Sequence, residues 1–287
     1  MPFYPILDRI GILVLLVILL ALLDAERGSP LRRRVDQWRR RLAINFGLGA
    51  PSLLVFRLLL IPVVVAAALW AEEHHLGLVR ALPLPRVAAA IVALALLDYS
   101  TYFWHRLMHG VPFLWRFHHV HHTDLDVDVS TSLRFHFGET VLAVAARSLQ
   151  VVIAGASPTV ALAFELILGA STIFHHSNLK LPRVADRFFN AFMMTPRAHG
   201  IHHSTVKRER NSNFSRVCNV WDRLHRTLLL NVRQDDIVIG VPEYREPREL
   251  TLASLLTMPL RAQRPTVPWA DSSTSAAVIA ARKKAEA

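Results

Sequence analysis

The apolar residues of this chain are gathered into long blocks, and this pattern restricts the possible folds more than any other feature. The blocks cover residues 10–23, 50–71, 87–104 and 140–174. Runs of this kind are typical of helices that lie within the apolar core of a bilayer. With 52% hydrophobic residues among 287, the chain is expected to form an all-α, multi-pass membrane protein with about four to five membrane helices.

The sequences of two of these blocks predict departures from a single straight helix. Pro51 and Pro62 lie in the second block, so a kinked helix is expected there. The last block is long enough for a hairpin of two helices with its turn at residues 155–158, the sequence GASP. Each arm then has about 16 residues and a length of ~24 Å, less than the ~30 Å apolar core of a bilayer. This length favours a partly re-entrant hairpin.

The positive charge is concentrated where it can set the topology. The formal net charge is +11, and seven arginines lie in the loop 24–43, between the first two apolar blocks. Such loops usually stay cytoplasmic and favour anionic lipid headgroups. The alternative, a basic RNA-binding arm, lacks aromatic or glycine-rich company, so no nucleic-acid partner is expected. Counting blocks from a cytoplasmic loop places every later histidine cluster in a cap on the cytoplasmic side. We expect a bacterial inner membrane in preference to the endoplasmic reticulum.

Histidine is concentrated in three groups with helical spacing. Seven of the fifteen histidines lie between Asp98 and Glu139. Residues three or four apart share one face of a helix, and Thr195 and Pro196 are suited to begin the helix that carries the third group. The groups are His105 and His109; His118, His121 and His122; and His199, His202 and His203.

So many imidazoles in few helices predict a metal site. Protonated rings would repel one another, and neutral rings would bury unpaired polar atoms unless a cation bound their lone pairs. Because one transition-metal ion takes roughly four to six ligands, these histidines fit two ions. No HExxH sequence of the zinc-protease type is present, and Cys218 is the only cysteine, so a mixed Cys and His zinc site is excluded. His74 and His75 are expected to lie in a loop without metal.

Asp98 interrupts an apolar block seven residues before His105. On a helix the two residues share a face but lie about 10 Å apart along the axis. Its carboxylate is therefore suited to accept a hydrogen bond from a metal-bound imidazole of a neighbouring helix. The alternative, an ordinary charge at a helix end, stays open.

Residues 90–230 resemble the fatty acid hydroxylase and sterol desaturase superfamily, integral membrane di-iron oxygenases with the pattern HxxxH, HxxHH, HxxHH. The same motifs occur here in the same order. They include DYxxYxxHRxxH from Asp98, LWRFHHVHH, the RxHxxE that ends at Glu139, TPxxHxxHH from Thr195, and NF from Asn213. The family's WDRLFGT appears as WDRLHRT from Trp221, which puts the local packing or the substrate entrance in question.

The resemblance implies a pair of iron ions near the cytoplasmic face, with O2 as co-substrate and a lipid C–H bond as the target. It implies the eight histidines above and His176 as ligands, and Asp98 and Glu139 as carboxylates that orient them. His136 and His175 are held as second choices, and His119 is expected to form a hydrogen bond nearby. Zinc can replace iron in a purified sample, because it binds such ligands more strongly. The electrons then come from a separate cytochrome b5-like protein, ferredoxin or reductase.

Two other functions fit the same residues. A desaturase would use the same metal site, and a metal-binding or transport protein would use no oxygenase chemistry. Histidines gathered at one end of the helices disfavour transport. The expected organisation is N-terminal membrane helices over 1–89, a catalytic domain over 90–230, a surface segment over 231–269 and a disordered tail over 270–287. An interfacial amphipathic helix is expected around residue 190.

Overall fold

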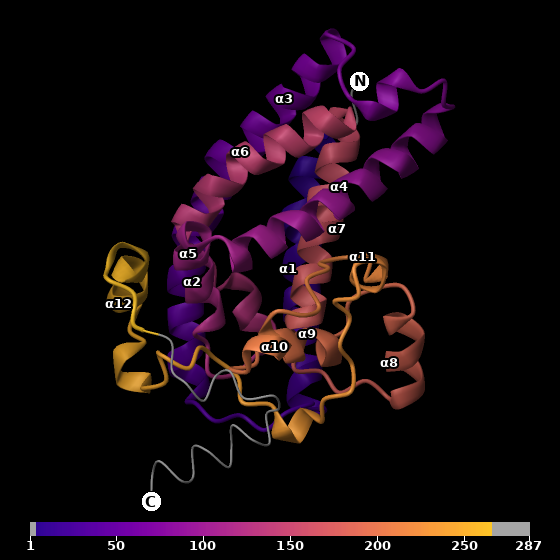
Figure 1. The fold of residues 1–287 in the computed structure, drawn as a ribbon. Helices are drawn as coiled ribbons and strands as arrows, with labels where there is room; N and C mark the ends of the chain where they lie inside the picture. Colours follow the sequence, from indigo (N-terminus) through magenta and orange to yellow (C-terminus); the bar gives the residue numbers. More distant parts are fainter. Residues whose placement is uncertain (1–3, 266–287) are drawn as a thin grey trace, which may run out of the picture.

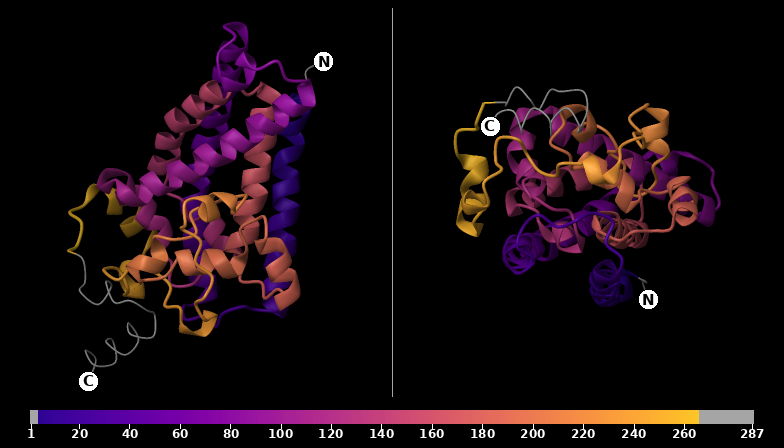
Figure 2. Two further views of the ribbon diagram at one scale, coloured as in Figure 1. Left: turned by 45° about the vertical axis from the view of Figure 1, so that its right-hand side comes forward. Right: turned by 90° about the horizontal axis from the view of Figure 1, so that it is seen from below.

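The computed structural model of the protein describes residues 4–265, and its regular structure is helical (Figure 1). Within these residues only isolated β-bridges occur beside the helices. The long helices lie side by side, and a cap of short helices covers one end (Figures 1 and 2). The long elements are α1 (Tyr4–Gly28), α2 (Trp38–Val55), α3 (Ile61–Glu73), α4 (Arg86–Gly110), α6 (Phe137–Ala154) and α7 (Pro158–His176).

Four helical segments in the described part of the chain are long and apolar enough to cross a membrane. Helix α1 adds a further apolar surface, because Leu13 and Val17 are more than 60% exposed. The prediction of an all-α, multi-pass membrane protein is therefore confirmed. The four segments are Trp38–Ala81, Arg86–Gly110, Phe137–Ala154 and Pro158–His176.

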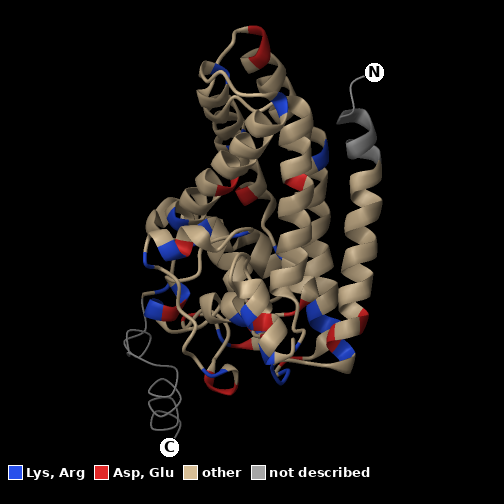
Figure 3. Cartoon of the chain, turned by 90° about the vertical axis from the view of Figure 1, so that its right-hand side faces the viewer, with Lys and Arg blue, Asp and Glu red and all other residues tan. Residues whose placement is uncertain are grey.

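The long helices alternate in direction, and this alternation brings the charged segments to one end. Helix α1 leads to the arginine loop, α2 and α3 lead away from it, α4 returns, and α6 and α7 go out and back (Figures 1 and 2). Most acidic and basic residues accordingly gather at the end that carries the cap (Figure 3). The topology count made from the sequence is correct in placing the histidine groups at the same end as the arginine loop.

The predicted hairpin of α6 and α7 is present, with its turn at the GASP sequence. Gly155 ends α6 with a φ of 74°, a conformation that favours glycine. Ser157 begins α7 by accepting a hydrogen bond from the Val160 N–H. A second glycine, Gly77, packs against this turn so closely that a Cβ atom there would lie 2.2 Å from the Gly155 Cα atom.

Helices α2 and α3 form one continuous helical segment with a π-helical turn, η1 (Phe56–Leu60), between them. Its signature is the Ile61 N–H, which donates to the Phe56 carbonyl five residues earlier. Pro62, the next residue, has no N–H to donate and its ring crowds the preceding turn. A wider turn accommodates the proline without ending the helix. The irregularity expected from the two prolines thus appears as a π turn next to Pro62, whereas Pro51 lies inside the regular helix α2.

The cap is built from short helices between and after the long ones. It packs against the near end of α2 through a cluster that includes Leu48, Val120 and Leu255, while a separate core that includes Val64, Leu97 and Leu162 holds the long helices together. The short elements are η2 (Leu78–Ala81), α5 (Pro112–His122), η3 (Val129–Leu133), α8 (Arg183–Asn190), α9 (Pro196–His202), α10 (Lys207–Arg210), α11 (Val220–Leu224), η4 (Gln234–Asp236), η5 (Pro247–Glu249), α12 (Leu252–Thr257) and η6 (Met258–Leu260).

The surface segments agree in part with expectation. Helix α8 lies where an interfacial helix was predicted, and Val184 and Phe188 are exposed by 81% and 62%. Two of the seven arginines in the loop 24–43, Arg32 and Arg41, are buried among cap residues, so they do not contact lipid headgroups. Both guanidinium groups have polar partners there, which charge patterning alone cannot indicate. The tail 270–287 lies outside the described residues.

Candidate metal centre

Two compact groups of histidines lie where α4, α5, α7 and α9 meet. Within each group the possible ligand nitrogens lie within 4.8 Å of one another. All nine histidines named as ligands from the sequence belong to these groups. The five-histidine group consists of His105, His109, His118, His122 and His202, and the four-histidine group consists of His121, His176, His199 and His203.

Each HxxHH sequence supplies both groups. In α5 the first and last histidines join the five-histidine group, whereas the middle one, His121, joins the four-histidine group. In the HxxHH of α9 the assignment is reversed. The first and last histidines join the four-histidine group, and the middle one, His202, joins the five-histidine group. The groups adjoin, because the rings of His122 and His203 stack with centroids 4.4 Å apart. The two boxes therefore tie the groups into one centre.

Hydrogen bonds fix the tautomer of five of these rings. In each case Nδ1 faces an oxygen that can only accept, so Nδ1 carries the proton and Nε2 presents a lone pair. Such contacts also orient metal-bound imidazoles. The acceptors are Phe214 O for His105 (2.6 Å), Ser212 O for His202 (2.7 Å), Arg134 O for His121 (3.2 Å), Thr172 O for His176 (2.7 Å) and Glu139 Oε1 for His118 (3.1 Å).

The Nε2 atoms of these rings converge at distances that a bound cation explains. His105 Nε2 lies 3.2 Å from that of His118 and 3.1 Å from that of His202, and the Nε2 atoms of His121 and His176 are 3.0 Å apart. None of the five has a proton left to donate, so the lone pairs would repel. Nitrogens at right angles around one ion, each bonded at about 2.1 Å, would be ~3.0 Å apart. The donor set therefore fits a metal in each group.

Burial keeps the cap histidines neutral, the form that binds metal. Burial first, and the charges of neighbouring histidines next, hold the pKa values of His121, His122 and His203 well below the ordinary value. Burial is also the main cause that lowers the pKa of His202 to about 3. Among the described residues, both ring nitrogens of His109 and of His122 lack a hydrogen-bond partner. Such groups are costly to bury, and a cation would satisfy them.

The two carboxylates named from the sequence have different partners. Glu139, at the start of α6, accepts a hydrogen bond from His118 Nδ1. Asp98 was expected to accept one from a histidine, and this partner is wrong. Its Oδ2 accepts from the Trp221 indole N–H at 2.8 Å and from the Cys218 N–H at 3.0 Å. Asp98 lies two helical turns before His105 on α4, and residues 218–221 fold over it and supply its hydrogen-bond donors.

The loop around Asn213 orients two of the histidine rings. In the sequence, only the family motif NF indicated that this loop is important. Asn213 adopts a φ of 54°, a conformation that Asn tolerates better than most residues. Its side-chain amide donates to the carbonyls of Ala198 and Leu229, both at 2.8 Å. Asp222 accepts from the Phe214 N–H at 2.9 Å. The residues on either side of Asn213 thereby direct their carbonyls at His202 and His105.

Sequence reasoning missed a buried ionic network under α5. Arg41 donates to both carboxylate oxygens of Asp124, at 2.7 and 2.8 Å, and to Asp128 at 2.6 Å. Burial alone would raise the pKa of Asp124, but Arg41 and Arg134 outweigh it and hold that pKa well below its usual range. Burial lowers the pKa of Arg134 to about 10, and its carbonyl orients His121. In the sequence, the alternating Asp residues of TDLDVD, residues 123–128, were the feature that could have indicated this network.

The remaining histidines of the region have other roles. His119 Nδ1 donates to the Trp115 carbonyl at 2.9 Å, as expected for a residue outside the HxxHH pattern. His136 begins α6, accepts from the Gly138 N–H and donates to the Leu256 carbonyl, so both its nitrogens are used. His175 is fully buried, with its ring 4.1 Å from that of His199 between centroids. It adjoins the four-histidine group without belonging to it.

The departure from WDRLFGT falls at His225 and Arg226. Arg226 has a φ of 57°. This left-handed conformation explains why the family motif has a glycine at this position, and it costs a non-glycine residue about 1–2 kcal/mol. The His225 ring stacks on Tyr102 with centroids 5.0 Å apart, and its Nε2 lies 3.1 Å from the Tyr99 hydroxyl. Both changes act on the packing of this turn against α4, away from the two histidine groups.

Comparison with known proteins agrees with this site. Residues 90–227 match the family model for fatty acid hydroxylases. The ornithine lipid hydroxylase OlsE of Rhizobium tropici is 30% identical over 158 residues, which make up 55% of this chain and 46% of that protein. The chain thus spans about half the length of this relative. The cholesterol 25-hydroxylase-like protein of Danio rerio is 25% identical over 235 residues, 79% of this chain and 91% of the relative.

None of the solved structures matches the chain. The matched family region contains every member of the two histidine groups, the orienting loop around Asn213, and the carboxylates of Glu139 and Asp222. The whole site thus lies within the fatty acid hydroxylase domain that residues 90–227 of this chain match.

Proposed function

We propose that the protein is a membrane di-iron oxygenase that hydroxylates a C–H bond of a lipid, with O2 and two electrons from a separate donor. The observation that carries this proposal is the convergence of unprotonated Nε2 atoms from four helices in a membrane-embedded hydroxylase domain. The names of both relatives contain a lipid class, ornithine lipid and cholesterol. We extend to this chain only what they share, a lipid substrate.

The chemistry requires a redox metal, because an unactivated C–H bond resists acids, bases and nucleophiles. When bound, a pair of iron ions supplies the activation of O2. The chain's own part is to hold the ligands before the metal arrives. Backbone carbonyls fix the Nδ1 protons, Glu139 keeps His118 in one orientation, and burial excludes water from the ring nitrogens. Rings held in this way need little reorganisation to bind.

The number of donors favours iron over zinc as the native metal. Zinc sites are usually tetrahedral with four ligands, whereas one group has five donors. Zinc is still expected in an overexpressed sample, since it outcompetes ferrous iron for imidazole.

The proposed orientation places the cap in the cytoplasm. It rests on the arginine loop 24–43, which lies at the same end as the cap and follows the usual excess of positive charge in cytoplasmic loops. A cytoplasmic cap would also give a soluble electron donor direct access to the side of the centre that faces away from the membrane.

The test is a comparison of membrane lipids under ¹⁸O2 in cells with and without the protein. Wild type is expected to produce a lipid with one added ¹⁸O atom. His109→Ala and His199→Ala should abolish this product, because each removes a member of one group. His74→Ala, an exposed histidine at the end of α3, serves as the matched control and should retain it. A product lacking two hydrogens would assign desaturation instead, and metal binding without O2 uptake would assign a non-catalytic protein.

A further inference from the structure

The indole ring of Trp115, on α5, lies between the five-histidine group and the surface of the cap. It is partly exposed, and its centroid lies 4.9 Å from that of His109, 5.4 Å from that of His122 and 6.2 Å from that of His118. His109 is itself the one member of the two groups that is not fully buried. At this point a single aromatic side chain separates the five-histidine group from the surface.

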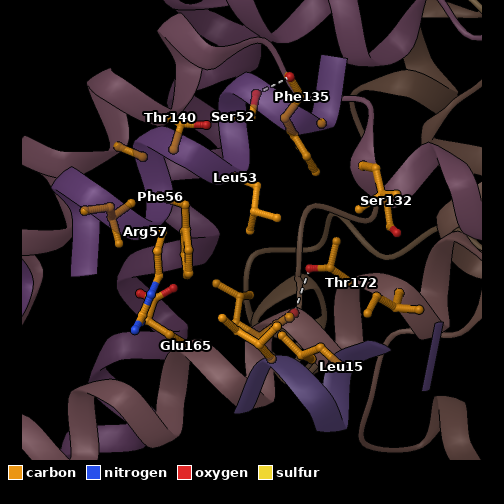
Figure 4. Close-up of a pocket in the computed structure, with 18 of the residues that line it drawn as sticks. Leu15, Ser52, Leu53, Phe56, Arg57, Ser132, Phe135, Thr140, Glu165 and Thr172 are labelled. Atoms are coloured by element: carbon orange, nitrogen blue, oxygen red, sulfur yellow. Dashed lines mark hydrogen bonds between the residues drawn. The ribbon is translucent and has the colours of Figure 1, made fainter. Parts of the chain in front are cut away.

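The other aromatic side chains in contact with the two groups face elsewhere. Apart from histidines, those among the described residues are Phe214 and Phe135. Phe214 is only 5% exposed. Phe135 lines a cavity of about 540 Å³ among the long helices (Figure 4), a volume within the range of small-molecule sites, roughly 300–1,000 Å³. Trp115 does not line this cavity, so the centre has one aromatic contact toward the cavity and another at the cap surface.

A stacked pair of rings connects the two histidine groups. His122, which contacts Trp115, stacks on His203 with centroids 4.4 Å apart and ring planes inclined by 22°. These two histidines belong to different groups. Electron tunnelling weakens steeply with distance and is faster through packed atoms than across gaps. The rings of Trp115, His122 and His203 therefore form a packed route from the surface through the five-histidine group to the four-histidine group.

The surface around Trp115 carries an excess of positive charge. The guanidinium of Arg210, on α10, lies over the indole ring with Cζ 5.2 Å from its centroid. Arg116 donates to the carbonyl of Arg261 in the neighbouring segment 243–264. Arg116, α10 and this segment contain eight basic and four acidic residues. Their net charge is thus +4 with every acidic neighbour counted, which complements an acidic partner. Trp115, Arg116, α10 and residues 243–264 are called the entry face below.

The entry face belongs to the charged cap and not to the apolar bundle. Lys207 and Arg208 of α10 are exposed, and charged residues gather at this end of the molecule (Figure 3). Anionic lipid headgroups would also be attracted by positive charge. A lipid surface gives no reason, however, for an indole ring that joins this face to metal-site histidines. An electron carrier gives that reason.

Building on the proposed function, we propose that the entry face is the docking site of an acidic protein that carries single electrons, and that Trp115 positions the path from it to the metal centre. One carrier molecule is oxidised at this face while a ferric ion held by the five-histidine group is reduced to ferrous. A second carrier molecule supplies the electron that passes through His122 and His203 to the other group. These two steps deliver the two electrons, and no bond forms or breaks in them.

Light-driven electron injection tests the route without a carrier protein and without lipid turnover. A ruthenium photosensitiser is attached to the oxidised, iron-loaded protein at Arg208→Cys, on α10, with Cys218→Ser removing the native thiol. Arg187→Cys, exposed on α8 at the opposite side of the cap, provides the control position (Figure 1). The loss of the ferric absorption band after the flash gives a first-order rate of reduction for each position.

Trp115→Leu should slow reduction from position 208 by about an order of magnitude and leave reduction from position 187 unchanged, because only the first route passes through the indole ring. Trp115→Phe keeps an aromatic ring and should give an intermediate rate. Trp70→Leu, an exposed tryptophan on α3, should have no effect. The iron content of each variant separates slower transfer from loss of metal. Equal slowing from both positions, or none from position 208, would overturn the route.

Docking is tested with a reduced, acidic [2Fe–2S] ferredoxin and the protein in phosphatidylcholine nanodiscs. Arg208→Glu should lower the second-order rate constant of reduction by about 10-fold, the lower end of electrostatic steering, and added salt should lower it in wild type. Arg183→Glu, exposed on α8, is the matched control and should match wild type. A wild-type rate constant that ignores salt would overturn the docking site even if Trp115→Leu fails to fold. Unchanged reduction of Arg208→Glu, together with weaker retention of phosphatidylglycerol, would assign the face to lipid headgroups instead.

The outcomes also separate this inference from the proposed function. Reduction of bound iron that depends on Trp115 and Arg208, without any ¹⁸O-labelled lipid, would leave the entry face standing and refute the oxygenase. Labelled lipid together with reduction that is insensitive to both residues would do the opposite.

Discussion

Replacing Arg41 by glutamine is expected to destabilise the cap severely. The guanidinium is 2% exposed and makes hydrogen bonds to Asp124, Asp128 and the Asp126 carbonyl. Removing one partner of a buried ion pair costs about 3–5 kcal/mol, because the other charges stay buried. At roughly 2–4 °C per kcal/mol for a chain of this size, the Tm should fall by about 6–20 °C.

Thermal unfolding of the metal-free protein in detergent measures this effect. Arg39→Gln, an exposed arginine on the same helix, is the matched control and should shift the Tm by less than about 2 °C, within the ±0.5 kcal/mol typical of surface changes. The double variant Arg41→Gln/Asp124→Asn should be more stable than the sum of the single changes predicts, because it removes both charges. A wild-type Tm in Arg41→Gln, or strict additivity in the double variant, would refute the reasoning.

Three further outcomes are expected. Glu139→Gln should weaken metal binding by about 10- to 100-fold, measured by chelator competition, because His118 loses its anionic partner; unchanged affinity would contradict this role. Asp98→Asn should cost about 1–3 kcal/mol in unfolding experiments with metal content unchanged, since its partner is Trp221; loss of metal would restore the histidine hypothesis. Acidification below pH ~6.5 should reduce stability. Burial lowers the pKa of His202 to about 3, so the unfolded chain binds more protons, and a Tm that stayed flat down to pH 5 would contradict this.

The histidine groups were predictable because helical spacing is a local property. Residues three or four apart must share a face, and the count of membrane crossings then brought His199 and His105 to the same end. The division of each HxxHH between two groups could not be predicted in this way. It depends on how α5 and α9 are rotated against one another, and that rotation is set by packing between segments about 80 residues apart.

Errors arose where a charge was interpreted without its partner. Asp98 sits at the expected depth in α4, but its hydrogen-bond donors come from residues 218 and 221, which the sequence does not place. The burial of Arg32 and Arg41 was not predicted, because composition gives the sign of a charge and not its burial. Asn213 was visible only as part of a motif, since its role depends on a φ of 54°.

The central claim is that the two histidine groups each hold one iron ion. The most direct test is the iron content of anaerobically purified protein, determined for wild type, His109→Ala and His199→Ala. The account predicts about two iron ions per chain in wild type. Each single variant should lose mainly the ion of its own group. The double variant His109→Ala/His199→Ala should bind neither ion. A single ion per wild-type chain, or two ions retained in either variant, would contradict it.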